Sequence, residues 1–148
     1  MKERIREKIN EIEEYLSRLI DIIPDDLKLY KSDDKARWSC EHGFEKIAEA
    51  IADLAFLVIK ENKLMGANDD FSAFDVLKNS GIITKELSIK LQDIKKMRNI
   101  ISHKYGEVDD DRVFNAIKEE LGADINEFLN SVSSFLEKEE NRRWDTQI

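Results

Sequence analysis

The sequence predicts an all-α protein, an up-and-down bundle of four to five helices, on three observations. Apolar residues recur at helical spacing over several long stretches, and no segment alternates as a half-buried strand does. One proline and five glycines among 148 residues leave few breaks, which favours long helices over many short strands. Apolar residues make up 41% and charged residues 38% of the chain, which excludes both a disordered chain and a membrane protein.

The first two predicted helices carry continuous apolar stripes. One covers residues 2–23 and ends before Pro24, and a polar connection follows it. The other covers residues 33–62, where Gly43 and several alanines indicate a close approach to another helix. The apolar residues at helical spacing are Ile5, Ile9, Ile12, Leu16, Leu19 and Ile20, then Phe44, Ile47, Ala48, Ile51, Leu54, Ala55 and Val58.

Two further helices are predicted in the middle of the chain. A short one covers residues 72–79, with Ser72 as its N-cap residue. Gly81 then breaks the chain, and Thr84 can cap a helix that runs to about residue 102 or beyond.

The last part of the chain predicts two helices and a tail. The acidic run 109–111 supplies an N-cap and acid in the first turn of a helix, and Gly122 ends that helix. A final helix covers residues 124–141, and the tail 142–148 is expected to fray. We therefore expect a single domain over residues 1–141.

The sequence predicts no membrane-spanning segment, signal peptide or internal disulfide. No stretch approaches the roughly 20 apolar residues that span a bilayer, and the charged, mixed-sign N-terminus is unlike a signal peptide. The single cysteine rules out an internal disulfide and fits a reducing cytoplasm. We expect a cytoplasmic protein that does not bind membranes.

The charge distribution is acidic overall with one basic exception. A net charge of -8 argues against a protein that coats nucleic acid without specificity. The segment 95–104 nevertheless contains no acidic residue, and its cationic or titratable residues are Lys95, Lys96, Arg98, His103 and Lys104. Such a patch can hold a phosphate at one place.

Within the predicted helix 84–102, an arginine interrupts the apolar stripe. The stripe consists of Leu87, Leu91, Ile94, Met97 and Ile101. At 100° per residue Arg98 lies about 40° from Ile94. A guanidinium among core positions must be paired, or must face a cavity or a partner surface. Asn99 and His103 are four residues apart, so their side chains are neighbours.

These polar groups suit metal-independent cleavage of a phosphodiester. Arg98 offers a planar set of donors for a phosphate, and His103 can move a proton near neutral pH. Asn99 can orient the histidine, and Tyr105 supplies a hydroxyl. The histidine would take the proton of a ribose 2′-OH or protonate the leaving oxygen, while the arginine stabilises the phosphorane. DNA, which lacks the 2′-OH, would be spared.

The pattern R-N-x-x-x-H-x-Y over residues 98–105 resembles the R-x4-H-x-Y motif of HEPN-domain toxins. More narrowly, it is similar to HepT-type toxins that are paired with a minimal nucleotidyltransferase antitoxin of the MntA type. The likeness covers most of the chain, including Glu41, the run 50–55 and the segment 74–82.

The resemblance implies a metal-independent RNA endonuclease, the toxin of a type VII toxin–antitoxin pair. Arg98 and His103 would be the catalytic pair, supported by Asn99, and Tyr105 would be the tyrosine to which the antitoxin adds AMP. The resemblance also implies a homodimer that forms through the motif helix and makes a composite site. RNA and an MntA-like nucleotidyltransferase would be its partners, with no cofactor. The alternative is a non-catalytic HEPN subunit that presents a nucleotide or substrate to such a nucleotidyltransferase.

Other polar and aromatic residues have simpler interpretations. His42 stands where many relatives have arginine after the glutamate, and it is interpreted as a surface or interface residue. Cys40 and His42 point to different faces of a helix, so a metal site is not expected. Trp38 and Phe44 are interpreted as core or dimer contacts. Glu41 and Asp53 are both flanked by apolar positions, which makes them candidates for pairing with basic groups.

Overall fold

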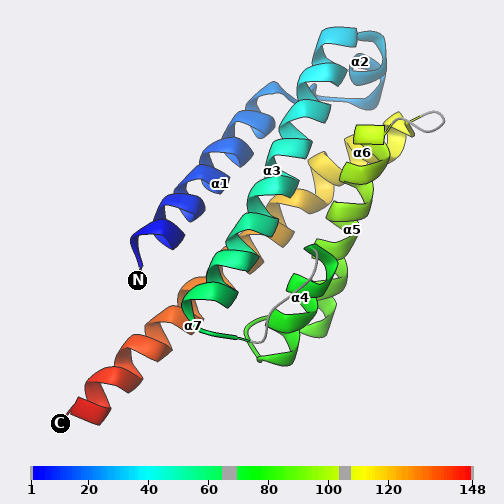
Figure 1. Cartoon of the computed structure of the whole chain (residues 1–148). Helices are drawn as coiled ribbons and strands as arrows, with labels where there is room; N and C mark the ends of the chain where they lie inside the picture. The colour runs from blue at the N-terminus through cyan, green and yellow to red at the C-terminus, as the bar shows by residue number, and fades with distance from the viewer. Residues whose placement is uncertain (1, 65–69, 104–107, 148) are drawn as a thin grey trace.

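The computed structural model, described for residues 2–64, 70–103 and 108–147, is built from helices, and these ranges contain no β-strand. Four long helices run up and down beside one another in an elongated bundle (Figure 1). They are α1 (Glu3–Ile22), α3 (Asp34–Glu61), α5 (Lys85–His103) and α7 (Gly122–Gln147). Three short helices connect or extend them: α2 (Leu27–Ser32), α4 (Asp70–Asn79) and α6 (Asp110–Asn115). The predicted all-α fold class is confirmed.

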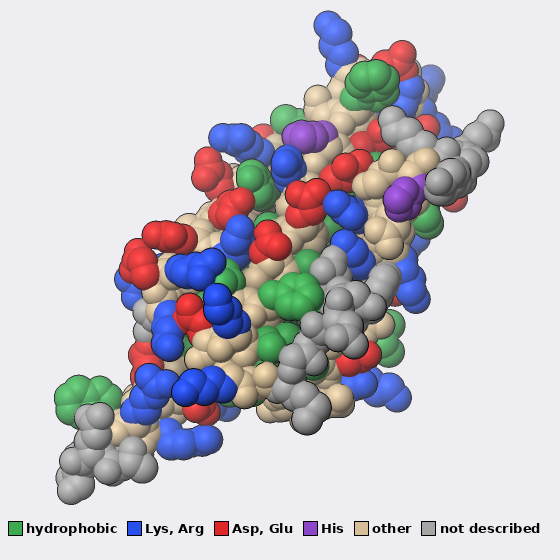
Figure 2. Space-filling model, in the orientation of Figure 1, with side chains coloured by type: hydrophobic (Ala, Val, Ile, Leu, Met, Phe, Trp, Pro, Cys, Tyr) green, Lys and Arg blue, Asp and Glu red, His purple; other side chains and the backbone are tan. Residues whose placement is uncertain are grey.

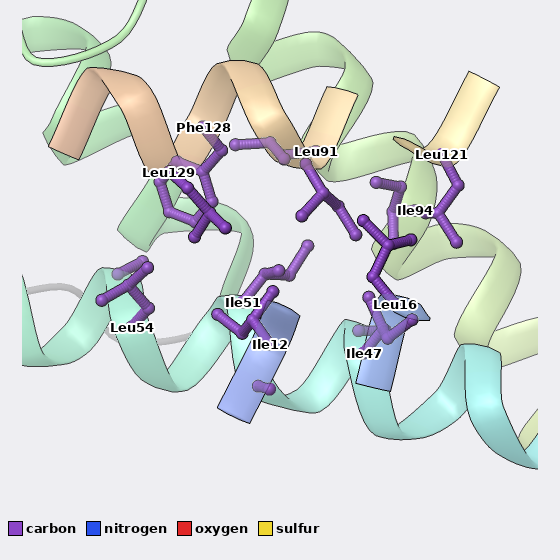
Figure 3. Packing of buried hydrophobic residues seen from close by; sticks show 14 of the residues in the cluster. Ile12, Leu16, Ile47, Ile51, Leu54, Leu91, Ile94, Leu121, Phe128 and Leu129 are labelled. Carbon is purple, nitrogen blue, oxygen red and sulfur yellow. The ribbon is translucent and has the colours of Figure 1, made fainter. Parts of the chain in front are cut away.

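The core lies where the four long helices face one another. Figure 3 shows Ile12 of α1, Ile51 of α3, Leu91 of α5 and Phe128 of α7 in the space between these helices, with Leu16 of α1 near Ile47 and Ile94. All of these side chains are at most 7% exposed. None of the described helices combines the length and the apolar character that crossing a bilayer requires.

Helix α3 has nearly the predicted bounds and packs closely on α1. The Asp33 side chain caps it by accepting a hydrogen bond from the amide of Ala36, 3.1 Å away. A Cβ atom added at Gly43 would lie 3.2 Å from Cδ1 of Leu19, tighter than ordinary van der Waals contact. The close helix approach predicted from Gly43 is therefore confirmed.

The short helix α2 was not predicted, because the stretch between the first two predicted helices was interpreted as a polar connection. It begins after Asp26, whose carboxylate accepts a hydrogen bond from the amide of Leu29 at 2.8 Å. Tyr30 is 0% exposed, with its ring centroid 5.5 Å from that of Phe114. Six residues are too few to show a helical period in the sequence, which is why this helix was missed. Burial of the Tyr30 ring stabilises it.

The connection from α4 to α5 matches the prediction except at the start of α4. Helix α4 already includes Asp70, so Ser72 lies inside the helix and its assignment as the N-cap residue was wrong. Gly81 adopts a φ of 77°, and the amide of Ile82 donates to the carbonyl of Leu77 at 2.9 Å, which is a Schellman ending. Thr84 caps α5 as predicted, its hydroxyl accepting from the amide of Leu87 at 3.0 Å.

The C-terminal third departs from prediction at Gly122. The predicted cap Asp109 is confirmed, since its carboxylate accepts from the amide of Arg112 at 3.2 Å. Helix α6 then passes into a π-helical segment, η1 (Ala116–Leu121), and on into α7. Gly122 has φ -59° and ψ -48°, an ordinary α conformation, so the predicted helix end there was wrong. Helix α7 continues to Gln147, and fraying of the tail 142–148 stays a prediction.

Candidate active site

Helix α5 holds Arg98 at the edge of the core. The stripe residues Leu87, Leu91, Ile94 and Ile101 are at most 7% exposed, and Met97 packs against the same cluster. The side chain of Arg98 lies among them and is 25% exposed. A guanidinium in this position must be paired, or must face a cavity or a partner surface, and in the structure it is paired.

The partner of Arg98 is Glu49 on α3. Nη2 of Arg98 donates to Oε1 of Glu49 at 2.9 Å, a charge-assisted hydrogen bond that joins two helices. The Nε atom of Arg98 is buried and has no hydrogen-bond partner among the described residues. An unpaired buried donor costs about 1–3 kcal/mol, and such an atom in a native fold calls for an explanation. A guanidinium held in this way retains donors for an anion.

His103 is the last residue of α5 and is exposed, one turn beyond the half-buried Asn99. A separation of five residues places Arg98 and His103 about 140° apart around the helix axis. A single α5 therefore presents these two side chains in different directions. Tyr105, the predicted site of AMP addition, lies outside the described residues.

The partner carboxylate is a residue that sequence reasoning missed. Of the two acids predicted to pair with basic groups, Asp53 lies 3.7 Å from Nζ of Lys8 on α1, whereas Arg98 is paired with Glu49. Glu49 lies between Ala48 and Ala50, both at most 3% exposed. The apolar residues on either side of Glu49 were the only sign in the sequence that it pairs with a basic group. Asp53 was predicted to pair with a basic group for the same reason.

The remaining candidates on α3 divide into buried and exposed residues. Cys40 and Phe44 are buried, and desolvation raises the pKa of the Cys40 thiol to about 11. His42 is exposed, and Trp38 is 72% exposed, so Phe44 joins the core as expected and Trp38 does not. Among the described residues no group of three or more His, Cys, Asp or Glu side chains could hold a metal ion.

A pocket of about 340 Å³ borders α5 on the side of η1 and α7. Ile94 and Met97 form part of its lining, and Lys90 of α5 lies 3.7 Å from the Asp124 carboxylate across it. Burial raises the pKa of Asp124. The pocket walls carry charges of both signs, so its ion pairs serve to join α5 to the start of α7.

A known protein family covers most of the chain. The sequence model of the Ribonuclease HepT-like family matches residues 12–132, which include all of α3, α4 and α5. The chain belongs to this family. Its fold is accordingly the HEPN fold, as the resemblance of the motif predicted.

One curated protein and several solved structures match over most of their length. A proposed RNase of Archaeoglobus fulgidus is 30% identical over 137 residues, which are 93% of this chain and 96% of that protein. A tri-AMPylated HEPN toxin of Shewanella oneidensis, solved in complex with an MNT antitoxin, superposes with a TM-score of 0.84 at 25% identity. That match covers 90% of this chain and 99% of the toxin. The Bacillus subtilis protein YutE superposes with a TM-score of 0.77 at 16% identity, over 92% of this chain and 90% of YutE. At this level of identity the similarity shows a shared fold only.

Proposed function

We propose that this HepT-like protein is a metal-independent RNA endonuclease that acts as the toxin of a toxin–antitoxin pair. The observation that carries the proposal is Arg98, a guanidinium kept at the edge of the core by Glu49 at 2.9 Å, with one buried donor unused. His103 follows it at the exposed end of the same helix. Membership of a ribonuclease family supports this assignment.

In this mechanism Arg98 holds the scissile phosphate and His103 moves the proton. The imidazole accepts the proton of the ribose 2′-OH, and the 2′ oxygen attacks phosphorus. The bond to the 5′ oxygen breaks as that oxygen takes up a proton from water. Arg98 stabilises the negative charge that builds on the phosphorane oxygens. Asn99, one turn before His103, orients the imidazole.

We infer that the site is shared by two protomers that pair through α5. Arg98 and His103 project about 140° apart on one helix, so they serve one phosphate more readily when two copies of α5 face each other. The exposed apolar side chains of α5, Ile89 at 51% and Ile100 at 56%, lie on the His103 side of the helix, opposite Arg98, and leave that side open to a partner. The alternative, a non-catalytic subunit of a nucleotidyltransferase, needs only the phosphate-holding Arg98.

Control by a nucleotidyltransferase is a further part of the proposal. The Shewanella oneidensis relative is a tri-AMPylated toxin bound to an MNT antitoxin, and we propose that Tyr105 accepts AMP in the same manner. The phenol oxygen would attack the α-phosphorus of ATP, and pyrophosphate would leave. A phosphate ester two residues beyond His103 would block RNA by bulk and by negative charge.

The test is RNA cleavage in the presence of EDTA by the wild-type protein and by Arg98→Ala and His103→Ala. We expect the wild type to cut structured RNA but not the matching DNA, and each variant to lose at least about a hundredfold in rate. A Tyr105→Phe protein, which cannot carry AMP there, ensures that an inactive result is not caused by modification. If that protein is folded and dimeric yet never cuts, the non-catalytic alternative replaces this one.

A further inference from the structure

A second pocket lies away from the candidate active site, between the N-terminal half of α1 and the C-terminal half of α3. Its volume is about 310 Å³. It is lined by Arg4, Lys8, Asp53, Phe56, Leu57 and Lys60. In Figure 2, Lys and Arg side chains gather over the region where these two helix halves meet. In a chain with a net charge of -8, three cations against one carboxylate mark a place suited to an anion.

Two of the three cations in this pocket are available for a ligand. Lys8 is held by carboxylates, with Glu11 at 2.8 Å and Asp53 at 3.7 Å. Arg4 and Lys60 are exposed, and neither side chain forms an ion pair or hydrogen bond with another described residue. Lys8 therefore neutralises the one carboxylate of the lining and leaves Arg4 and Lys60 to face the anion.

The pocket also has an apolar side beside these charges. Phe56 and Leu57 are partly buried and pack against the core while lining the pocket. A cation next to an aromatic ring matches the chemistry of a nucleotide, in which a phosphate adjoins a planar base. An acidic peptide would satisfy the cations, but its carboxylates have no planar group for the ring.

The pocket is aligned with the candidate active site along α3. At 3.6 residues per turn, Phe56 and Lys60 both lie within about 20° of Glu49 around the helix. With a rise of 1.5 Å per residue they lie about 10 Å and 16 Å beyond it. Because Glu49 holds Arg98, a strand whose phosphate is bound at Arg98 can follow α3 to this pocket.

We propose that the pocket binds a phosphate and the adjoining base of the RNA strand outside the bond that is cut. The proposal rests on the proposed ribonuclease function for the identity of the ligand. Arg4 and Lys60 contact the phosphate, and the base packs on Phe56. The pocket thus extends the substrate site and makes a longer strand bind more tightly than a short one.

The test measures binding of fluorescein-labelled single-stranded RNA by fluorescence anisotropy, in EDTA and in a His103→Ala background so that the strand stays intact. The pocket variant is Arg4→Glu/Lys60→Glu. Its control is Lys85→Glu/Lys118→Glu, which changes the net charge equally at exposed positions that line neither pocket. We expect the pocket variant to lose about tenfold or more in affinity, and the salt slope to shrink by about 1.4 for two lost contacts. The control should keep both values.

Several outcomes would overturn the proposal. Equal losses in the two charge-reversal variants would mean that only the overall field acts, and no loss in the pocket variant would mean that RNA does not reach the pocket. Binding of AMP that is lost in the pocket variant, with unchanged RNA affinity, would assign the pocket to a free nucleotide. Arg4→Lys/Lys60→Arg should restore binding, which a misfolded variant would not explain. Because no step requires cleavage, the result stands apart from the ribonuclease test.

Discussion

Helices α1 and α5 are nearly equal in length, 20 and 19 residues, and both pack against α3. The buried face of α1 consists only of apolar residues. The corresponding face of α5 contains the buried Ser88 and, within its stripe, the guanidinium of Arg98. Both helices pack through an apolar stripe with a paired cation beside it, Lys8 on α1 and Arg98 on α5. Two carboxylates hold Lys8, whereas the Nε atom of Arg98 is buried without a hydrogen-bond partner among the described residues. The comparison teaches that the polar exception, rather than the stripe, marks the candidate site.

The sharpest way to break this comparison is a large-to-small change on α1. Ile12 is 0% exposed, so Ile12→Ala removes core contacts and is expected to lower the free energy of unfolding by about 2–5 kcal/mol. Cleavage per folded molecule at low temperature should remain. Urea denaturation and RNA cleavage measure the two quantities.

The matched change on α5 is Arg98→Met. The Glu49 side chain is 44% exposed, so its carboxylate stays hydrated when methionine replaces its partner. We therefore expect stability to change by no more than about 1 kcal/mol while cleavage is lost. If Ile12→Ala slowed cleavage per folded molecule as strongly as Arg98→Met, the two helices would not differ in role.

Carboxylates that pair with arginine provide a second comparison. Glu49→Ala frees the Arg98 guanidinium, and we expect cleavage to slow about tenfold to a hundredfold because the group is misplaced. Glu49→Gln keeps an acceptor oxygen and should restore part of the rate. The control is Glu14→Ala on α1, which removes an exposed ion pair to Arg18 at 3.3 Å and should change neither rate nor stability measurably. Equal rates for wild type and Glu49→Ala would remove Glu49 from the site.

Substitutions at the N-terminal caps of α5 and α1 are expected to have the smallest effects on the free energy of unfolding. The hydroxyl of Thr84 caps α5, whereas Lys2 at the start of α1 makes no side-chain cap hydrogen bond. Thr84→Ala should lower the free energy of unfolding by about 1 kcal/mol, and Lys2→Ala should change it by less than about 0.5 kcal/mol. Thermal denaturation of the two variants tests this, and equal shifts would contradict it.

Much of the fold was predictable because the apolar stripe and the cap residues of a long amphipathic helix indicate where it begins and ends. The stripes of α1, α3 and α5 extend over several turns, and the caps Thr84 and Asp109 are local signals. Helix α2 escaped prediction because six residues show no period, and Gly122 was misread because glycine permits a helix end without requiring one. Motif resemblance identified the family, which the comparisons confirmed.

Of the candidate site, only the arrangement of residues within α5 was predictable from the sequence. The position of Arg98 within the stripe follows from the helical period, and its need for a partner follows from the cost of an unpaired charge. The identity of that partner does not, because Glu49 lies 49 residues away in sequence and the packing of α3 on α5 decides which acid meets it. The roles of His103 and Tyr105 stay predictions.

The π-helical segment η1 has a consequence for how this fold tolerates changes in chain length. Losing one residue from an α-helix turns everything beyond it by about 100° and would carry the apolar side chains of α1 or α5 out of the core. A π-helical turn already contains a surplus residue, so a deletion within Ala116–Leu121 can be absorbed by return to the α pattern, with Phe128 and Leu129 still facing α3. Single-residue insertions and deletions among homologous chains are accordingly expected to collect at this segment.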